Sequence, residues 1–368
     1  MAENLSQKTL SRNRIPQIEL LRAIAMAGIF VFHLWSVVPN VAESGPLGRS
    51  IAHASSFGYL GVVLFNFISG FVLALPYLGP KQRGIPSYPN FLHRRFKRIA
   101  PKYYLALTFW AGVLLLLGKA RSGSLLPDYL AHLAFIHSIF PAMFFSIVPA
   151  YWWLGLMAQF YLLFPILLRF FKMFGAARAC LLVCLTSWVC WVVIDLLSHP
   201  GNSWALVNYM LYYNLPARLP EFAIGMWLAE AWHAGNFGEP PARTSWHSTI
   251  SPAYKAFVGA ALLFAIAGSS IVPLEGLPLR HICMVCWCLA GFVAVLLLDL
   301  SRRLGQTLVV AKFAAASYSI YLLHQPLLGY ANRLLGDMLQ PPAEFALLLV
   351  VVGAVSFALA ATLDRFLI

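Results

Sequence analysis

A long apolar segment near the amino terminus carries two ionisable residues, Arg22 and His33, eleven positions apart. At 100° per residue, eleven helical steps end about 20° beyond three full turns, with a rise of roughly 16 Å. One helix face therefore offers a guanidinium for an anion and, deeper in the membrane, an imidazole for a reacting hydroxyl. The alternative is structural: Arg22 reaches lipid phosphate, and His33 hydrogen-bonds to a carbonyl group inside the protein. The spacing leaves both interpretations open.

A basic cluster follows the second apolar segment and contains Arg94, Arg95, Lys97 and Arg98. Asn90 is placed to cap a short interfacial helix there. Because arginine presents planar, bidentate donors to phosphate oxygens, this cluster is suited to a cytoplasmic phosphate-bearing ligand. The general excess of cations on the cytoplasmic side of membrane proteins explains such a run equally well.

Two further polar groups lie within apolar segments. Arg218 and Glu221 are three positions apart, so they can pair and partly neutralise each other in a bundle of low dielectric constant. Ser317, Tyr321 and His324 follow the spacing of one helical stripe. For the first group we favour structural pairing, and for the second we favour helix packing through hydroxyl groups.

The elements that must position these residues are membrane helices. Hydrophobic residues make up 60% of the 368 residues and charged residues only 11%, whereas soluble proteins have roughly 45 to 50% and about 25%. The excess apolar side chains must therefore face lipid. Six cysteines fall in apolar runs without metal-ligand spacing, so we expect neither a metal site nor disulfides.

Windows of about 20 apolar residues predict an all-α, polytopic transmembrane bundle of ten spans. These spans are 18–38, 57–78, 102–118, 151–171, 177–197, 205–231, 253–273, 281–300, 313–333 and 344–364. The stretch 130–145 is a further apolar segment, suited to an interfacial or re-entrant helix. We expect a cytoplasmic tail over 1–17 and one transmembrane domain over 18–368. The polar stretches are too short to form a fused soluble domain.

The distribution of basic residues predicts the orientation. With both termini in the cytoplasm, the cytoplasmic segments hold 19 Lys and Arg and the outer segments hold 5, while Arg22 and Arg218 lie inside spans. The net charge of +13 is thus mostly a topology signal, and we expect no nucleic-acid partner. The expected location is the cell membrane, with the lipid bilayer as a partner.

The identity and order of several motifs resemble the acyltransferase-3 family of integral membrane acyltransferases. The resemblance covers about residues 16 to 364 and rests on Ile18-Glu-Leu-Leu-Arg-Ala-Ile-Ala25 with Phe32-His33, Gly61-Val-Val-Leu-Phe-Asn-Phe-Ile-Ser-Gly-Phe-Val-Leu73, Arg94-Arg-Phe-Lys-Arg-Ile-Ala-Pro101, Phe160-Tyr-Leu-Leu-Phe-Pro165, Arg218-Leu-Pro-Glu-Phe-Ala-Ile-Gly225 and Ser317-Tyr-Ser-Ile-Tyr-Leu-Leu-His324.

This resemblance implies transfer of an acyl group, often acetyl, from cytoplasmic acyl-CoA to a hydroxyl of a surface glycan, lipid-linked sugar or small molecule. Acyl-CoA is then a substrate, and no tightly bound cofactor is expected. The CoA phosphates suit Arg22 and the basic cluster, and the thioester reaches His33. His33 then serves either as the general base for the acceptor hydroxyl or as an acyl carrier.

One departure from the family pattern concerns the carboxylates. Many relatives carry a Glu pair just before the Phe-Tyr-Leu-Leu-Phe-Pro element, where this chain has Met157 and Ala158. Either Gln159 or Glu221 substitutes for them, or the acceptor chemistry is altered.

Two other functions fit the same features. A multispan transporter or flippase would line its path with the intramembrane ionisable residues. A catalytically inactive relative would serve as a sensor or scaffold, in keeping with the missing carboxylates. The sequence determines neither the acceptor, the acyl length nor the oligomeric state.

Overall fold

The computed structural model describes residues 15–79, 83–119, 124–198, 203–234, 277–335 and 338–366. In these ranges every regular element is helical. The α-helices are α2 (Pro16–Val37), α3 (Gly45–Ser56), α4 (Leu60–Ala74), α5 (Tyr88–Leu116), α6 (Leu125–Leu133), α7 (Trp152–Phe174), α8 (Ala176–Leu197), α9 (Ser203–Tyr213), α10 (Leu215–His233), α12 (Leu277–Leu297), α13 (Asp299–Gly305), α14 (Leu308–Leu335) and α15 (Pro341–Phe366). Short 3₁₀ turns are η1 (Pro39–Glu43), η2 (Phe57–Tyr59), η3 (His137–Ile139) and η4 (Pro149–Tyr151). The all-α prediction is confirmed; residues 1–14 of the expected tail lie outside the described ranges.

Seven helical stretches of the described residues are long and apolar enough to cross a membrane. They are Pro16–Val37, Gly45–Ala74, Tyr88–Leu116, Pro149–Phe174, Ala176–Leu197, Pro278–Leu297 and Pro341–Phe366. The count of ten stays a prediction, because the predicted segment 253–273 lies outside the described residues. The segment 313–333 falls within α14.

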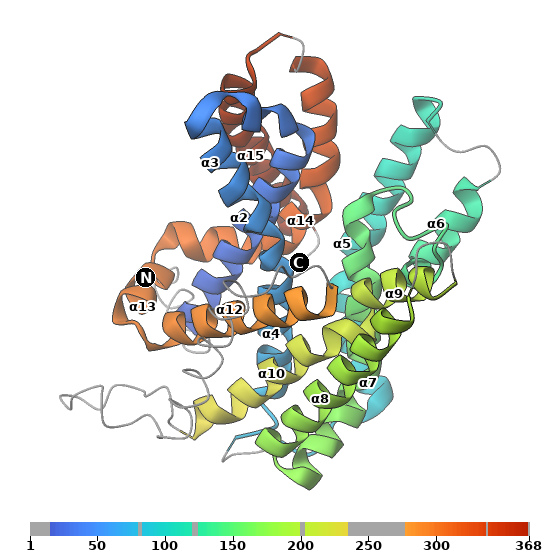
Figure 1. Cartoon of the computed structure of the whole chain (residues 1–368), viewed down its shortest axis with the longest axis vertical. Coiled ribbons are helices and arrows are strands. Elements are labelled where there is room, and N and C mark those ends of the chain that lie inside the picture. Colours follow the sequence, from blue (N-terminus) through green and yellow to red (C-terminus); the bar gives the residue numbers. More distant parts are fainter. Residues whose placement is uncertain are drawn as a thin grey trace.

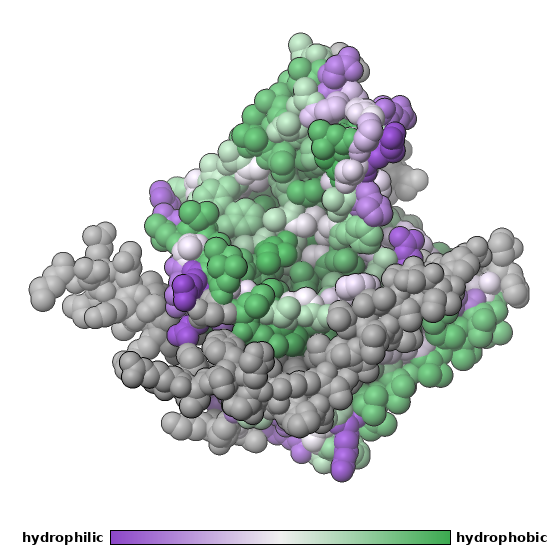
Figure 2. Space-filling model, turned by 60° about the vertical axis from the view of Figure 1, so that its left-hand side comes forward, coloured by the Kyte–Doolittle hydropathy of each residue, from purple (hydrophilic) through white to green (hydrophobic). Residues whose placement is uncertain are grey.

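The surface of the helices agrees with a lipid-facing exterior. On α8, Leu181, Leu185, Val189 and Val193 recur every four positions, and each is about half exposed. Such a stripe would be costly in water and is favourable against acyl chains. On the face in Figure 2, apolar residues cover much of the described surface and hydrophilic residues gather mainly near its margins.

The predicted segment 205–231 is two helices rather than one. α9 ends at Tyr213, and Asn214 is extended, with φ −115° and ψ −176°, before α10 begins. Pro216 lies in the first turn of α10, where a missing amide proton costs nothing. The break therefore lies just before Pro216, and Pro220 follows inside α10.

The helices form two groups with a layer between them. In Figure 1, α2, α3, α14 and α15 lie together, α5 to α9 form the other group, and α4, α10 and α12 lie between. α14 packs against both α2 and α15. This packing brings an early segment of the chain against a late one.

Helices α4 and α10 pack backbone to backbone through Gly70 and Gly225. A Cβ atom on Gly70 would overlap the carbonyl oxygen of Phe222, and a Cβ atom on Gly225 would overlap the backbone of α4 in the same way. Small residues allow membrane helices to approach this closely. The contact holds Asn66 of α4 beside Glu221 of α10.

The apolar stretch 130–145 continues from α6 into η3 and turns, rather than forming one long helix. His132 and His137 stack there, with ring centroids 3.8 Å apart and planes inclined by 7°. His132 Nδ1 lies 2.8 Å from the carbonyl oxygen of Asp128, and His137 Nε2 lies 2.9 Å from that of Tyr151. Both rings are fully buried.

Candidate functional site

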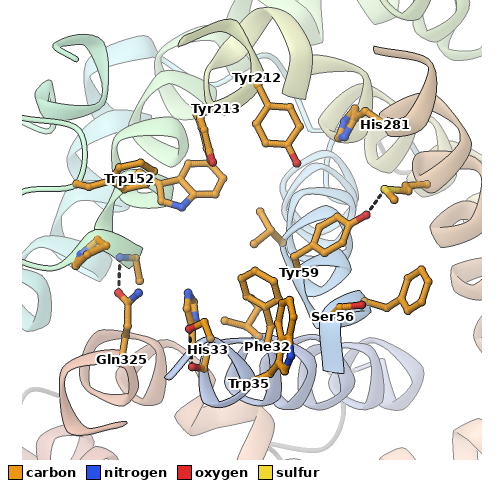
Figure 3. A pocket seen from close by; sticks show the side chains of 18 of the residues that line it. Phe32, His33, Trp35, Ser56, Tyr59, Trp152, Tyr212, Tyr213, His281 and Gln325 are labelled. Carbon is orange, nitrogen blue, oxygen red and sulfur yellow. Dashed lines mark hydrogen bonds between the residues drawn. The ribbon is translucent and has the colours of Figure 1, made fainter. Parts of the chain in front are cut away.

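A cavity of about 680 Å³ lies among α2, α3, α4, α7, α9, α10, α12 and α14. Its walls are rich in aromatic side chains: Phe32, Trp35, Phe57, Tyr59, Phe145, Trp152, Tyr212, Tyr213 and Tyr321. Figure 3 labels six of these, Phe32, Trp35, Tyr59, Trp152, Tyr212 and Tyr213. No Asp or Glu is among the described residues that line it. A proton acceptor at this surface must therefore be a group other than a carboxylate, and His33 is such a group.

His33, near the end of α2, forms a hydrogen-bonded pair with His324 of α14. His324 Nδ1 lies 2.9 Å from the carbonyl oxygen of Tyr321, which can only accept, so the hydrogen-bond network assigns the proton to this nitrogen. His324 Nε2 is then unprotonated and lies 2.9 Å from His33 Nδ1, which donates to it. Neutral His33 is left with its lone pair on Nε2.

The face of α14 that carries His324 is fixed against η4. The Tyr321 hydroxyl donates to the carbonyl oxygen of Ala150. Gln325 Oε1 accepts from the Ala150 amide at 2.6 Å, and the Tyr151 hydroxyl donates to the carbonyl oxygen of Leu322 at 2.9 Å. These contacts restrain α14 at the position where His324 meets His33.

The three residues predicted on one stripe of α14 have separate surroundings. Tyr321 lines the cavity, and His324 lies behind His33. The Ser317 hydroxyl donates to the carbonyl oxygen of Ala314 in its own helix at 2.8 Å. Ser317 is therefore outside the site.

Glu221 lies at the centre of a buried polar group behind the cavity wall. Its carboxylate accepts from Arg218 at 3.0 Å and from Asn66 at 2.6 Å, and His281 Nε2 lies 2.8 Å away. Asn66 in turn accepts from Trp153 Nε1 at 2.9 Å. The predicted pairing of Arg218 with Glu221 is present, and the pair orients two residues of the wall, Arg218 and His281.

The guanidinium of Arg218 is enclosed by aromatic residues. Its Nε donates to the carbonyl oxygen of Tyr212 at 2.7 Å, and its Cζ lies 4.4 Å from the centre of the Tyr212 ring. The ring of Trp152 lies 5.8 Å away on the cavity side. Paired and surrounded in this way, the cation is tolerated inside the bundle.

The positions where relatives carry carboxylates do not supply an alternative acid. Met157 is buried in the apolar core. The side-chain amide nitrogen of Gln159 donates to Asn214 Oδ1 at 2.7 Å. Among the described residues, the side-chain partner of His33 is an imidazole, His324, and neither Gln159 nor Glu221 hydrogen-bonds to it.

Arg22 does not reach the cavity. It pairs with Glu19 at 3.2 Å near the start of α2, while His33 lines the cavity near the other end. The two residues share a helix, as predicted, but of the two only His33 lines the cavity.

The predicted basic cluster lies in the first turns of α5, continuous with the membrane helix rather than in a separate short one. Arg94, Lys97 and Arg98 are exposed, whereas Arg95 is partly buried with its Cζ 5.4 Å from the centre of the Phe91 ring. Arg95 Nε is buried and has no hydrogen-bond partner among the described residues.

Arg22 and part of the basic cluster converge on one tyrosine. Arg95, Arg98 and Arg22 all act electrostatically on Tyr161 of α7. Three cations from two helices, α2 and α5, therefore lie in the neighbourhood of this tyrosine. This is a second polar region, separate from the aromatic cavity.

Several cavity residues were not among the candidates from sequence. His281, at the start of the predicted span 281–300, is an ionisable residue in a membrane helix, the same signal that selected His33. Gln325, Tyr212 and Trp152 carry no such signal, because aromatic and amide side chains are common in membrane bundles.

Known proteins resemble this chain over most of its length. A family model described as "Acyltransferase domain" matches residues 15–361. "Acyltransferase MdmB" of Streptomyces mycarofaciens is 24% identical over 348 residues, which cover 89% of this chain and 82% of that protein. "Putative acetyltransferase ORF330" of Acidianus two-tailed virus is 26% identical over 230 residues, covering 58% of this chain and 63% of that protein. No solved structure matches the chain.

Proposed function

The chain belongs to the acyltransferase-3 family, and on that basis we propose that it transfers an acyl group, with acetyl the first expectation, from acyl-CoA to a hydroxyl of an acceptor bound in the aromatic cavity. The observation that carries this proposal is the histidine pair. His324 fixes the proton of His33 on Nδ1, so that Nε2 is available as a base in a cavity whose described lining has no carboxylate.

In the proposed reaction, His33 Nε2 takes the proton of the acceptor hydroxyl as its oxygen attacks the thioester carbonyl carbon. The carbon–sulfur bond breaks, and the CoA thiolate leaves with the proton that His33 returns. His324 Nε2 accepts a hydrogen bond from His33 Nδ1–H throughout and stabilises the His33 imidazolium that forms in between. The same lone pair also suits an acyl-histidine route, in which Nε2 attacks the thioester first.

Gln325 is placed to stabilise the oxyanion. Its Oε1 is occupied by the amide of Ala150, and its side-chain nitrogen lies on the cavity side in Figure 3. The two N–H groups of the Gln325 side chain, held in this way, can donate hydrogen bonds to the oxyanion of a tetrahedral intermediate.

The proposed orientation places both termini in the cytoplasm of a cell whose plasma membrane holds the protein. The region of Arg22, Arg95 and Arg98 then faces the cytoplasm, where it binds the phosphates of acyl-CoA. The aromatic cavity lies toward the opposite side and receives a glycan, a lipid-linked sugar or a small hydroxyl compound. The acyl-pantetheine arm would have to reach His33 between the two regions.

The test is acetyl transfer by purified protein in detergent, followed by release of free CoA and by mass spectrometry of a pool of candidate acceptors. Wild-type protein should consume acetyl-CoA. His33→Ala should lose turnover by about 10²- to 10⁴-fold, with an unchanged melting temperature as the control for folding. Full turnover in His33→Ala would refute the assigned role, and substrate flux without any acylated product would support a transporter instead.

A further inference from the structure

Arg280 is a cation in the wall of the aromatic cavity that no described carboxylate neutralises. It lies on α12, is exposed, and lines the same cavity as His33. The described lining contains two arginines, Arg218 and Arg280, and no Lys, Asp or Glu. Arg218 is paired with Glu221 behind the wall, whereas none of the ion pairs among the described residues includes Arg280. The described wall therefore carries one fixed positive charge that is not balanced.

The contacts of α12 place the charge of Arg280 on the cavity side. Arg280 and Met284 are four positions apart, so they share one face of the helix. The Tyr59 hydroxyl donates to Met284 Sδ, along a dashed line in Figure 3, and both residues line the cavity. Arg280 also acts electrostatically on Tyr59, as does Arg218 from α10. The charge of Arg280 therefore lies on the face of α12 that meets Tyr59.

The position of Arg280 within α12 is unfavourable for a cation. α12 begins at Leu277, so Arg280 lies in the first turn, which contains no acidic residue. The amide groups of a first turn form the positive end of the helix dipole, where acidic residues are stabilising and basic residues are not. Helix stability thus does not account for an arginine here. An anion bound beside Arg280 would be attracted both by the guanidinium and by this end of the helix.

We propose that Arg280 binds an anionic group of the acceptor, a phosphate or a carboxylate, while a hydroxyl of the same molecule lies at His33. A guanidinium donates two parallel hydrogen bonds to either group, and the described lining holds no carboxylate that would repel it. The acceptor is accordingly an anion, and neutral compounds of the same shape bind more weakly. This inference rests on the proposed function for the role of His33. It gives Arg280 a part in binding and specificity and none in the chemical step.

Three substitutions separate anion binding from other roles of this side chain. Arg280→Gln removes the charge and keeps a polar side chain, and Arg280→Lys keeps the charge without the planar pair of donors. Arg49→Gln is the matched control, because Arg49 is an exposed arginine of α3 that does not line the cavity. Anion binding predicts that Arg280→Gln is more damaged than Arg280→Lys. A purely structural role of the arginine side chain predicts equal damage.

The experiment measures ligand binding to the full-length protein by saturation-transfer difference NMR, in octaethylene glycol dodecyl ether, a detergent without sugar or phosphate. Three probes share one ring: α-D-glucose 1-phosphate, methyl α-D-glucopyranosiduronate and the neutral methyl α-D-glucopyranoside. We expect wild-type protein to bind at least one anionic probe more tightly than the neutral one. Arg280→Gln should raise the Kd of that probe about tenfold, and Arg280→Lys and Arg49→Gln should raise it less than about threefold. The Kd of the neutral probe should not change.

Two further ligands test other sources of phosphate. CoA carries phosphates of its own, and dioctanoylphosphatidylglycerol stands for a lipid headgroup. If Arg280 belongs to the acceptor site, the Kd for CoA should be the same in wild-type protein and Arg280→Gln, and the lipid should not displace the anionic probe. Melting temperatures report whether each variant is folded.

Five results would overturn the inference: no preference of wild-type protein for an anionic probe, an unchanged Kd in Arg280→Gln, an equal loss in Arg280→Lys, a loss confined to CoA, or displacement of the probe by the lipid. The readout does not depend on turnover. A protein that binds an anionic probe through Arg280 and never consumes acetyl-CoA would keep this anion site and refute the proposed function. Acetyl transfer to an acceptor whose KM is unchanged in Arg280→Gln would do the opposite.

Discussion

His324 Nε2 lies 2.9 Å from His33 Nδ1, although 291 positions separate the two residues in the chain. The contact joins α2 to α14 and leaves the lone pair of His33 Nε2 without a hydrogen-bond partner among the described residues, in a side chain that lines the cavity. The hydrogen bond at one ring nitrogen of a histidine sets its tautomer. The other ring nitrogen then keeps its lone pair and can act as a base.

The first prediction concerns His324. His324→Gln keeps an oxygen that accepts the His33 proton, whereas His324→Asn keeps the donor to Tyr321 and removes that acceptor. We expect kcat to fall by up to about 10⁴-fold in the Asn variant, because the group that holds the catalytic imidazole in one tautomer is lost, and much less in the Gln variant, with the acetyl-CoA KM unchanged in both. Steady-state kinetics measure this, and a loss confined to KM would show that His324 does not act through His33.

A second prediction tests the oxyanion donor. Gln325→Glu is nearly isosteric and keeps the oxygen that accepts from the Ala150 amide, while it replaces the proposed donor with an acceptor. The expected result is a decrease of about 10²- to 10³-fold in kcat without a change in melting temperature. Wild-type kcat in Gln325→Glu would exclude Gln325 from the oxyanion site.

The third prediction concerns the donor site. Arg95→Gln removes a partly buried guanidinium whose Nε lacks a partner among the described residues. Hydrogen bonds to charged groups contribute about 1.5 to 3 kcal/mol, so the KM for acetyl-CoA should rise roughly tenfold or more. Arg178→Gln, an exposed cation at the start of α8, is the control and should leave KM unchanged. Equal effects of the two changes would indicate a general loss of positive charge rather than a phosphate site.

A fourth prediction concerns stability. Gly225→Ala places a Cβ atom against the backbone of α4, and overpacking of this kind costs about 1 to 3 kcal/mol. The melting temperature in detergent should fall clearly. Gly291→Ala on α12 is the matched control, because a Cβ atom there meets no atom within 4 Å. If both variants melt alike, the α4–α10 contact is looser than the structure shows.

The fifth prediction is a pH dependence of stability that arises from the stacked histidines. Burial lowers the pKa of His132 to about 4, and burial together with the nearby His132 lowers the pKa of His137 to about 3. The folded protein therefore keeps both rings neutral, while the unfolded chain takes up protons below about pH 6.5. Stability is full above that pH and falls by about 1.4 kcal/mol per unit for each histidine as the pH drops toward the folded values.

Melting temperatures between pH 7.5 and pH 4.5 measure this dependence. The double variant His132→Asn with His137→Gln keeps a side-chain donor near each carbonyl partner and removes the titrating groups. Its melting temperature should vary less with pH than that of the wild type. An identical pH profile in both proteins would assign the dependence to other groups.

The sequence predicted the parts of this molecule that depend on local composition. Apolar runs located the membrane helices, and the rule that buried ionisable residues are costly selected His33, Arg218 and Glu221. It did not predict the partner of His33, because contacts between segments far apart in the chain leave no periodic trace. For the same reason, the spacing of Arg22 and His33 predicted that the two residues share a helix, but it did not predict that the cavity reaches His33 and not Arg22.

Backbone detail was also beyond sequence reasoning. The extended conformation of Asn214 depends on its surroundings, since its side chain donates to the carbonyl oxygens of Ser138 and Met210. The stretch 130–145 is apolar enough for a helix, yet it forms turns, with positive φ at Phe135. Tertiary contacts outweigh helix propensity in both places.

The contact between α2 and α14 has a consequence for biosynthesis. The ribosome delivers α2 to the membrane early, and α2 carries an imidazole whose partner has yet to be translated. A nascent chain arrested before residue 308 lacks α14 entirely, so its His33 lacks the hydrogen-bond acceptor that fixes the proton on Nδ1. The growing polypeptide thus acquires its histidine pair only when nearly all of it has been made.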